Sequence, residues 1–161
     1  MLPCALAGAP PHLSYARASL LSYGFFLTQN YSQEQLLINM SEKEKVEKAM
    51  LDFIRGGDNR DVELLDNVLH HDFRVTNNGF MGKPGVTIID KQRYLQNIKD
   101  GIFGGLPRQV SIEHVDFTKT IAMVKVRLES KENSFVSYNS FVLDTNNQWR
   151  LIINLAVVEA K

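Results

Sequence analysis

Hydrophobic side chains recur every three or four residues in three segments that follow residue 40. Residues 42–55 carry one such stripe and precede two glycines, which predicts an amphipathic helix with a glycine stop. The stripe returns in residues 62–70 behind several capping candidates, and again between Asp90 and Gly101. The pattern therefore predicts three helices, with a short strand at residues 73–78 between the second and the third.

The second half of the domain changes to an alternation of apolar and polar residues. Four segments show it: 110–117, 121–128, 135–143 and 149–158. Short polar links separate them, so consecutive strands are expected to pair antiparallel. One face of the resulting sheet has to be buried, and the helices are available to cover it. We therefore expect a single α+β domain over residues 40–161.

Composition and charge narrow the classes of partner. The chain has 161 residues, with 18 Lys and Arg against 18 Asp and Glu, and one cysteine. A balanced charge argues against nucleic acid and against an anionic membrane surface, because both bind through a large positive surplus. No apolar run reaches the roughly 20 residues that span a bilayer. A lone cysteine cannot form an internal disulfide.

Residues 1–39 differ from the rest of the chain. They hold only two charged side chains, Arg17 and Glu34, and show no steady period. A secretory signal needs basic residues before an uninterrupted apolar stretch, and this pattern is missing, which favours a cytoplasmic location. Met40 directly precedes a capped helix with Ser41 as the N-cap, so we expect residues 1–39 to be a disordered extension or a mis-assigned start.

Four short motifs, taken together with the order of the elements, resemble one branch of a known superfamily. They are FIRGGD at 53–58, VLHHDF at 68–73, AMVKV at 122–126 and WRLI at 149–152. In order and spacing they are similar to the SnoaL-like, "putative lumazine-binding" branch of the nuclear transport factor 2-like superfamily. The resemblance implies a cone-shaped fold, in which a curved antiparallel sheet wraps around three N-terminal helices.

The resemblance also bears on function, although the superfamily contains isomerases, cyclases, dehydratases and transport factors alike. It implies a homodimer formed through the sheet. Steroid isomerase relatives use two carboxylates, and approximate matching places Asn77 or Asn78 at the first position and Asn139 at the second. An amide cannot take up a proton at neutral pH, so that mechanism has no base here.

Histidines and neighbouring acids are the remaining candidates for proton transfer. His71 closes the second predicted helix, and His114 and Asp116 share one face of a strand, so these three residues are the catalytic candidates. Each also has an ordinary reading as a solvated surface residue. His70 and His71 are adjacent and are expected to diverge, and no ligand spacing is present, so neither a metal nor a cofactor is expected.

The implied cone also predicts which side chains face its interior. The ligand-binding candidates are Met50, Phe53, Asn78, Tyr94, Ile98, Val124, Val126, Asn139, Phe141, Ile152 and Asn154. Such a lining suits a small hydrophobic or aromatic molecule with one or two polar groups. Three hypotheses stay open: a small-molecule-binding domain, an enzyme of the cyclase, dehydratase or isomerase kind, and a homodimeric interaction module without a ligand.

Overall fold

The computed structural model describes residues 40–161, and the interpretation of residues 1–39 lies outside them. Helix α2 (Glu42–Asn59) begins at a capping box in which Ser41 accepts from the backbone of Glu44, and the Glu44 carboxylate accepts from Ser41 in return. The helix continues through Gly56 and Gly57, so the predicted glycine stop is wrong. It ends at Arg60, whose left-handed backbone lets its N–H bond the last carbonyls.

The remaining elements follow in the predicted order, with two additions, η1 and β2. They are α3 (Val62–Val68), β1 (Leu69–Asn78), a short helix η1 (Phe80–Gly82), β2 (Val86–Asp90), α4 (Lys91–Lys99), β3 (Gln109–Thr118), β4 (Ile121–Glu129), β5 (Asn133–Leu143) and β6 (Trp149–Ala160). Strand β2 was not predicted; it is an exposed edge strand at the end of the sheet. The described helices include none long and apolar enough to cross a membrane.

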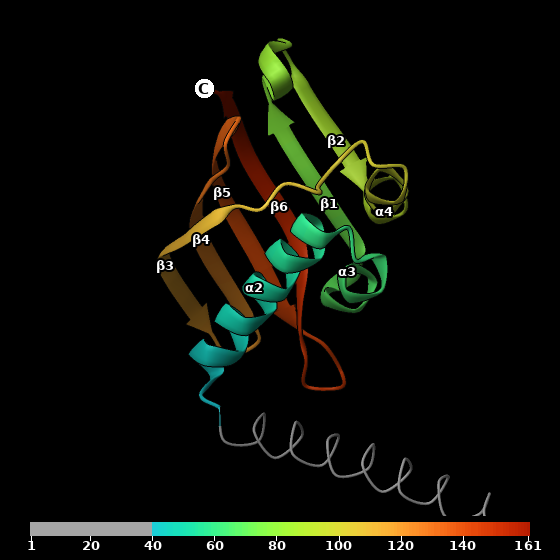
Figure 1. Ribbon diagram of the computed structural model, residues 1–161. Helices are drawn as coiled ribbons and strands as arrows, with labels where there is room; N and C mark the ends of the chain where they lie inside the picture. The colour runs from blue at the N-terminus through green and yellow to red at the C-terminus, as the bar shows by residue number, and fades with distance from the viewer. Residues whose placement is uncertain (1–39) are drawn as a thin grey trace, which may run out of the picture. The chain divides into compact units, whose positions relative to one another are not determined.

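The six strands form one sheet in the order β2-β1-β6-β5-β4-β3. The four late strands pair antiparallel, as predicted, whereas β1 pairs parallel with β6. The sheet is therefore mixed rather than wholly antiparallel. Within residues 40–161, the helices α2, α3 and α4 lie against one face of it, with α2 crossing in front of the late strands and α4 beside β2 (Figure 1).

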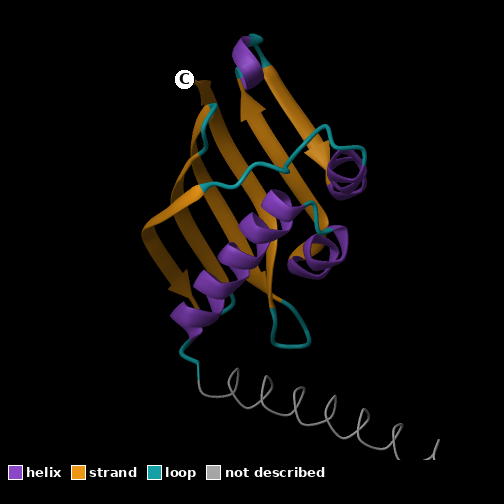
Figure 2. Cartoon of the chain, viewed as in Figure 1, coloured by secondary structure: helices purple, strands orange, loops and turns teal. Residues whose placement is uncertain are grey.

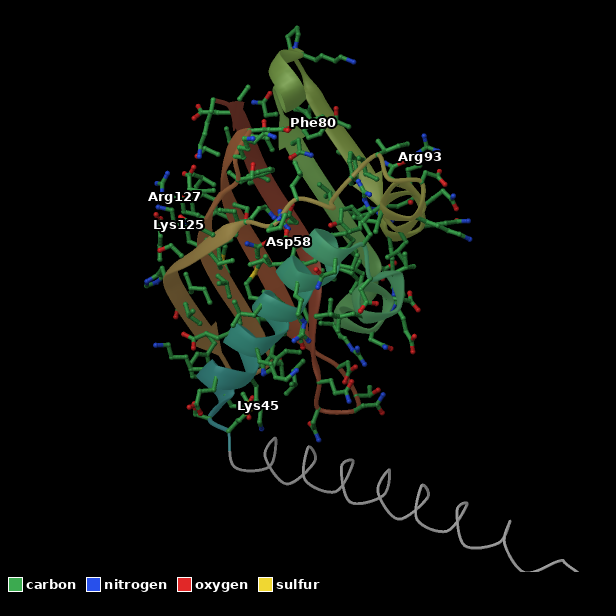
Figure 3. The ribbon with its side chains drawn as sticks, viewed as in Figure 1. Lys45, Asp58, Phe80, Arg93, Lys125 and Arg127 are labelled. Carbon is green, nitrogen blue, oxygen red and sulfur yellow. The ribbon has the colours of Figure 1, made fainter. Side chains whose placement is uncertain are left out.

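The core lies between this sheet face and the helices. Its largest fully buried apolar side chains are Met50, Leu65, Phe73, Ile98, Phe141 and Leu151. Alternation along β4 puts Val124 and Val126 inward, while Lys125 and Arg127 point to the other face and pair with Glu113. In Figure 3, Lys125 and Arg127 lie at the left edge of the sheet, away from α2.

The segment between α4 and β3 passes over the C-terminal end of α2 (Figure 2). Gly105 donates its N–H to the carbonyl of Gly57 at 3.1 Å, and the Arg60 side chain donates to the carbonyls of Gly101, Phe103 and Gly104. Two turns of backbone can lie this close because the contact is made between glycines. This segment, residues 101–108, is called the strap below.

Gly104 should be the least replaceable glycine of the strap. It has a φ of +70°, and a Cβ there would overlap the carbonyl oxygen of Gly57. We expect Gly104→Ala to lower the free energy of unfolding by roughly 2–4 kcal/mol, from backbone strain and the clash together. Gly79→Ala is the matched control, because Gly79 has a φ of +76° with no atom in the way, so strain alone should cost about 1–2 kcal/mol. Equal losses in urea denaturation of the two variants would contradict the close contact.

Candidate functional site

A cavity of about 310 Å³ lies between the strap and the inner face of the sheet. Residues of α2, α4 and the strap line one side, and residues of β1, β4, β5 and β6 line the other. The predicted ligand residues Phe53, Tyr94, Ile98 and Asn154 are all in the lining. Helix and strand residues that are far apart in the sequence therefore meet around one space.

Four aromatic rings form a continuous wall of the cavity. Tyr94 lies 6.0 Å from Phe53 and 6.0 Å from Phe103, measured between ring centroids, and Phe103 lies 6.0 Å from Phe80. These separations are typical of interacting aromatic pairs. Burial raises the pKa of the Tyr94 hydroxyl to about 12. The hydroxyl therefore stays protonated at neutral pH and can donate a hydrogen bond.

Arg108 is the cationic residue of the lining, and its charge is already compensated. Its Nε donates to Oδ1 of Asp58 at 2.5 Å, and its Nη2 donates to the carbonyl of Ile54 at 3.3 Å. The guanidinium also lies 5.5 Å from the ring centroid of Phe135. Asp58 stands at the end of α2 under the strap (Figure 3). The ion pair thus joins helix and strap and compensates the charge of Arg108.

Polar side chains gather on the floor of the cavity, which the sheet provides. Asn77, Ser137 and Asn154 come from three adjacent strands, with Ala156 between Asn77 and Ser137 in the strand register. All four residues are buried. Because alanine is small, it leaves open space above the sheet where the polar groups converge.

Several predicted ligand residues lie elsewhere. Met50, Val124, Val126 and Phe141 are buried in the core and are not part of the lining. Asn139 is fully buried behind the floor, where its amide bonds to Val124, Ser137 and Asn154. These side chains do face inward as predicted, but helix packing fills the interior there.

Asn78 and Ile152 depart from the predicted faces because of strand geometry. Asn78 is exposed, and its neighbour Asn77 lines the cavity instead. The alternation of Phe73 and Val75 carries that signal, since it places residue 77 on the inner face. Ile152 sits at a register shift in the pairing of β5 with β6, so Leu151 takes the buried position.

The three catalytic candidates do not reach the cavity. His114 pairs with Lys125 and Asp116 with Met123, which places both on the sheet face opposite the helices. His71 lies at the start of β1 with 80% of its side chain exposed, and its Nε2 is 2.9 Å from Oδ2 of Asp72. A group that transfers a proton to a bound molecule has to lie within hydrogen-bond reach of it.

His70 and His71 do not diverge, contrary to the expectation from the sequence. Their ring centroids are 4.0 Å apart, and together with Asp72 they could offer ligand atoms to one ion. The cause is a register irregularity in β1 between Leu69 and Arg74, which interrupts the alternation of side chains. His71 and Asp72 are exposed, and this cluster is separate from the cavity lining.

The strap residues and Ser137 also line the cavity, although the sequence pattern did not predict them. Ser137 stands two residues before Asn139 on β5, so the period of the strand was a usable signal for it. Arg108, Phe103 and Phe80 come from irregular segments or their edges, where no period exists. Their place in the lining follows from tertiary contacts alone.

His70 should make the stability of the domain sensitive to pH. Burial lowers its pKa below the ordinary histidine value, and the neighbouring His71 adds to the effect. The unfolded chain then takes up a proton at a higher pH than the folded chain does. The free energy of unfolding is therefore expected to fall as the pH drops from neutral through the lowered pKa of His70.

His70→Asn tests this dependence, because an asparagine oxygen can replace the Nδ1 atom that accepts from the backbone of Asp72. We expect a smaller decrease in melting temperature between pH 7.5 and pH 5.5 in this variant than in the original chain, by roughly one to a few degrees. His114→Asn, on the outer face, controls for the loss of a histidine. Parallel curves for His70→Asn and the original chain would refute the prediction.

A comparison with protein families matches residues 41–155 to the family described as "Putative lumazine-binding". No curated protein sequence matches the chain. Several solved structures share its fold. A nuclear transport factor 2-like protein of unknown function from Shewanella baltica has 14% identity and a TM-score of 0.65, and the match covers 76% of this chain and 100% of that one.

Two further structures are similar over most of their length. A nuclear transport factor 2-like protein from Cytophaga hutchinsonii has 18% identity and a TM-score of 0.64, with 74% of this chain and 100% of that chain covered. A ketosteroid isomerase-like protein from Erwinia carotovora has 10% identity and a TM-score of 0.62, with 75% and 98% covered. At these identities the likeness establishes the fold.

Proposed function

Because the chain belongs to the "Putative lumazine-binding" family of nuclear transport factor 2-like proteins, we propose that its cavity binds a small hydrophobic or aromatic molecule carrying one or two polar groups. The observation that carries this proposal is the combination of an aromatic wall with a polar floor around one cavity of about 310 Å³. This volume lies at the lower end of the range of ligand sites, roughly 300–1,000 Å³.

The two sides of the cavity suit different parts of such a molecule. A planar ring can stack between Phe53, Tyr94 and Phe103, where burial of apolar surface stabilises it. Its polar groups can meet the amides of Asn77 and Asn154 on the opposite side. Arg108 is already paired with Asp58, so the lining does not favour an anionic molecule.

The proposal includes binding but no reaction. His71, His114 and Asp116, the candidates for proton transfer, lie outside the lining. A cytoplasmic location stays a prediction that rests on the sequence pattern of residues 1–39.

A larger side chain on the cavity floor should weaken the binding of a small aromatic molecule. Ala156→Leu places a larger side chain between Asn77 and Ser137, and we expect it to weaken binding of naphthol, a fluorescent aromatic alcohol, by at least tenfold. Val157→Leu is the matched control, because Val157 neighbours Ala156 on β6 but points to the outer face, 50% exposed. Fluorescence titration measures both. The same affinity in both variants would show that naphthol binds outside the cavity.

A second proposal concerns the outer face of the sheet, which we infer to be the interface of a homodimer. Large apolar side chains lie exposed across four strands there: Ile88, Met123, Tyr138, Ile153, Leu155 and Val157. The register joins the residues of β4, β5 and β6 into one patch, since Leu155 pairs with Tyr138, and Met123 and Ile153 both pair with Ser140. A large apolar patch of this kind marks an interaction surface, and a second copy offers the same patch for a symmetric contact.

Met123→Glu should separate the two copies. It places a carboxylate in the middle of the patch, where pairing with a second copy would bury two like charges. Sedimentation equilibrium at high micromolar concentration should give twice the chain mass for the original protein and the mass of one chain for the variant. Lys131→Glu, in the exposed β4–β5 link, should remain a dimer. A monomer mass for the original chain would end this proposal.

A further inference from the structure

A chain of hydrogen bonds beneath the cavity floor starts at a backbone carbonyl. The Nδ2 group of Asn139 donates to the carbonyl oxygen of Val124 at 3.2 Å and to Oγ of Ser137 at 3.0 Å. A carbonyl oxygen can only accept, so the Asn139 amide has one possible orientation. Its nitrogen faces β4, and its oxygen faces β6.

The next link fixes Asn154 in the same way. Its Nδ2 donates to Oδ1 of Asn139 at 2.7 Å, and both amides are buried. Oδ1 of Asn154 is then left as an acceptor, and no residue that the structure describes donates a hydrogen bond to it. Ser137 already accepts from Asn139 through its Oγ, which leaves its O–H free to donate.

Beside the amide of Asn77, the floor therefore presents two groups of known polarity to the cavity: an acceptor on Asn154 and a donor on Ser137. Both groups neighbour the small Ala156, since Ser137 pairs with Ala156 across the strands and Asn154 precedes it by two residues on β6. The two groups therefore border the same part of the floor.

We propose that Asn139 is a positioning residue that tunes the floor to recognise a neutral aromatic cyclic amide. The N–H of that amide would donate to Oδ1 of Asn154, and its C=O would accept from the hydroxyl of Ser137. The inference rests on the proposed binding of a small molecule in this cavity, and it names the chemical class of that molecule.

Two other classes fit the floor less well. A ketone or lactone has no N–H, so when it covers Oδ1 of Asn154 it leaves that acceptor without a donor. A carboxylate needs a cation, and the lining's Arg108 is engaged by Asp58 and by the carbonyl of Ile54. The cyclic amide satisfies the donor and the acceptor without bringing a charge into the cavity.

Carbostyril and coumarin test the class directly in the unmodified chain. They are bicyclic aromatic molecules of nearly the same shape, and they differ in that the lactam N–H of carbostyril is a ring oxygen in coumarin. We expect calorimetric titration to give carbostyril the tighter binding by at least about tenfold. N-methylcarbostyril should behave like coumarin. Equal or reversed affinities overturn the inference.

Asn139→Leu tests the positioning role. The substitution removes the partner that holds Asn154, so its amide can turn and the preference for carbostyril over coumarin should shrink towards one. Ser137→Ala is the matched control: it removes the donor used by both carbonyls, so it should weaken both molecules and keep their ratio. A merely structural role of Asn139 would lower both affinities without changing the ratio, and that result would overturn the assignment.

The outcomes separate this inference from the proposed function. If naphthol binding is lost in Ala156→Leu while carbostyril and coumarin bind equally, the cavity binds small molecules but does not select cyclic amides. If naphthol, carbostyril and coumarin all fail to bind, the proposed function is refuted together with the inference. The comparison of carbostyril with coumarin needs no variant, so it decides the question even if Asn139→Leu does not fold.

Discussion

The backbone contact between the end of α2 and the strap is the constraint on which the cavity depends. Gly57 accepts from Gly105 at a distance that a side chain at Gly104 would prevent. Arg60 then holds three strap carbonyls, and Asp58 holds Arg108. These contacts keep Phe103 over the sheet as part of the aromatic wall, so a space remains between strap and floor.

The cavity combines two kinds of surface because it lies between two kinds of element. Helix α4 and the strap contribute rings whose burial is favourable without any partner. The sheet contributes amides, which are costly to bury unless they are hydrogen-bonded. Asn139 meets this requirement inside the sheet, whereas Asn77 and Asn154 turn polar atoms towards the cavity. The same requirement fixes the orientation of the Asn154 amide, since its nitrogen has to donate to the oxygen of Asn139.

Alternation of side chains along each strand gives the sheet a buried inner face and an exposed outer face. Val124 packs under the helices, while the neighbouring Met123 is 52% exposed on the outer face. His114 and Asp116 belong to that outer face, and their two-residue spacing carries no information about which face is the inner one. A small irregularity in a strand changes this assignment further, as at Ile152, where one register shift moves the buried position to Leu151.

By itself, the sequence determined the three helices, the antiparallel late strands and the inward side of Phe53, Tyr94, Val124 and Asn154, because burial of one face imposes a period on each regular element. Only the tertiary structure decided that Met50 and Phe141 are packed solid while Asn77, Ser137 and Arg108 border an open space. The period of an element tells which of its sides is buried. The cavity arises because contacts between residues distant in sequence, two glycines and an ion pair, hold the strap away from the sheet.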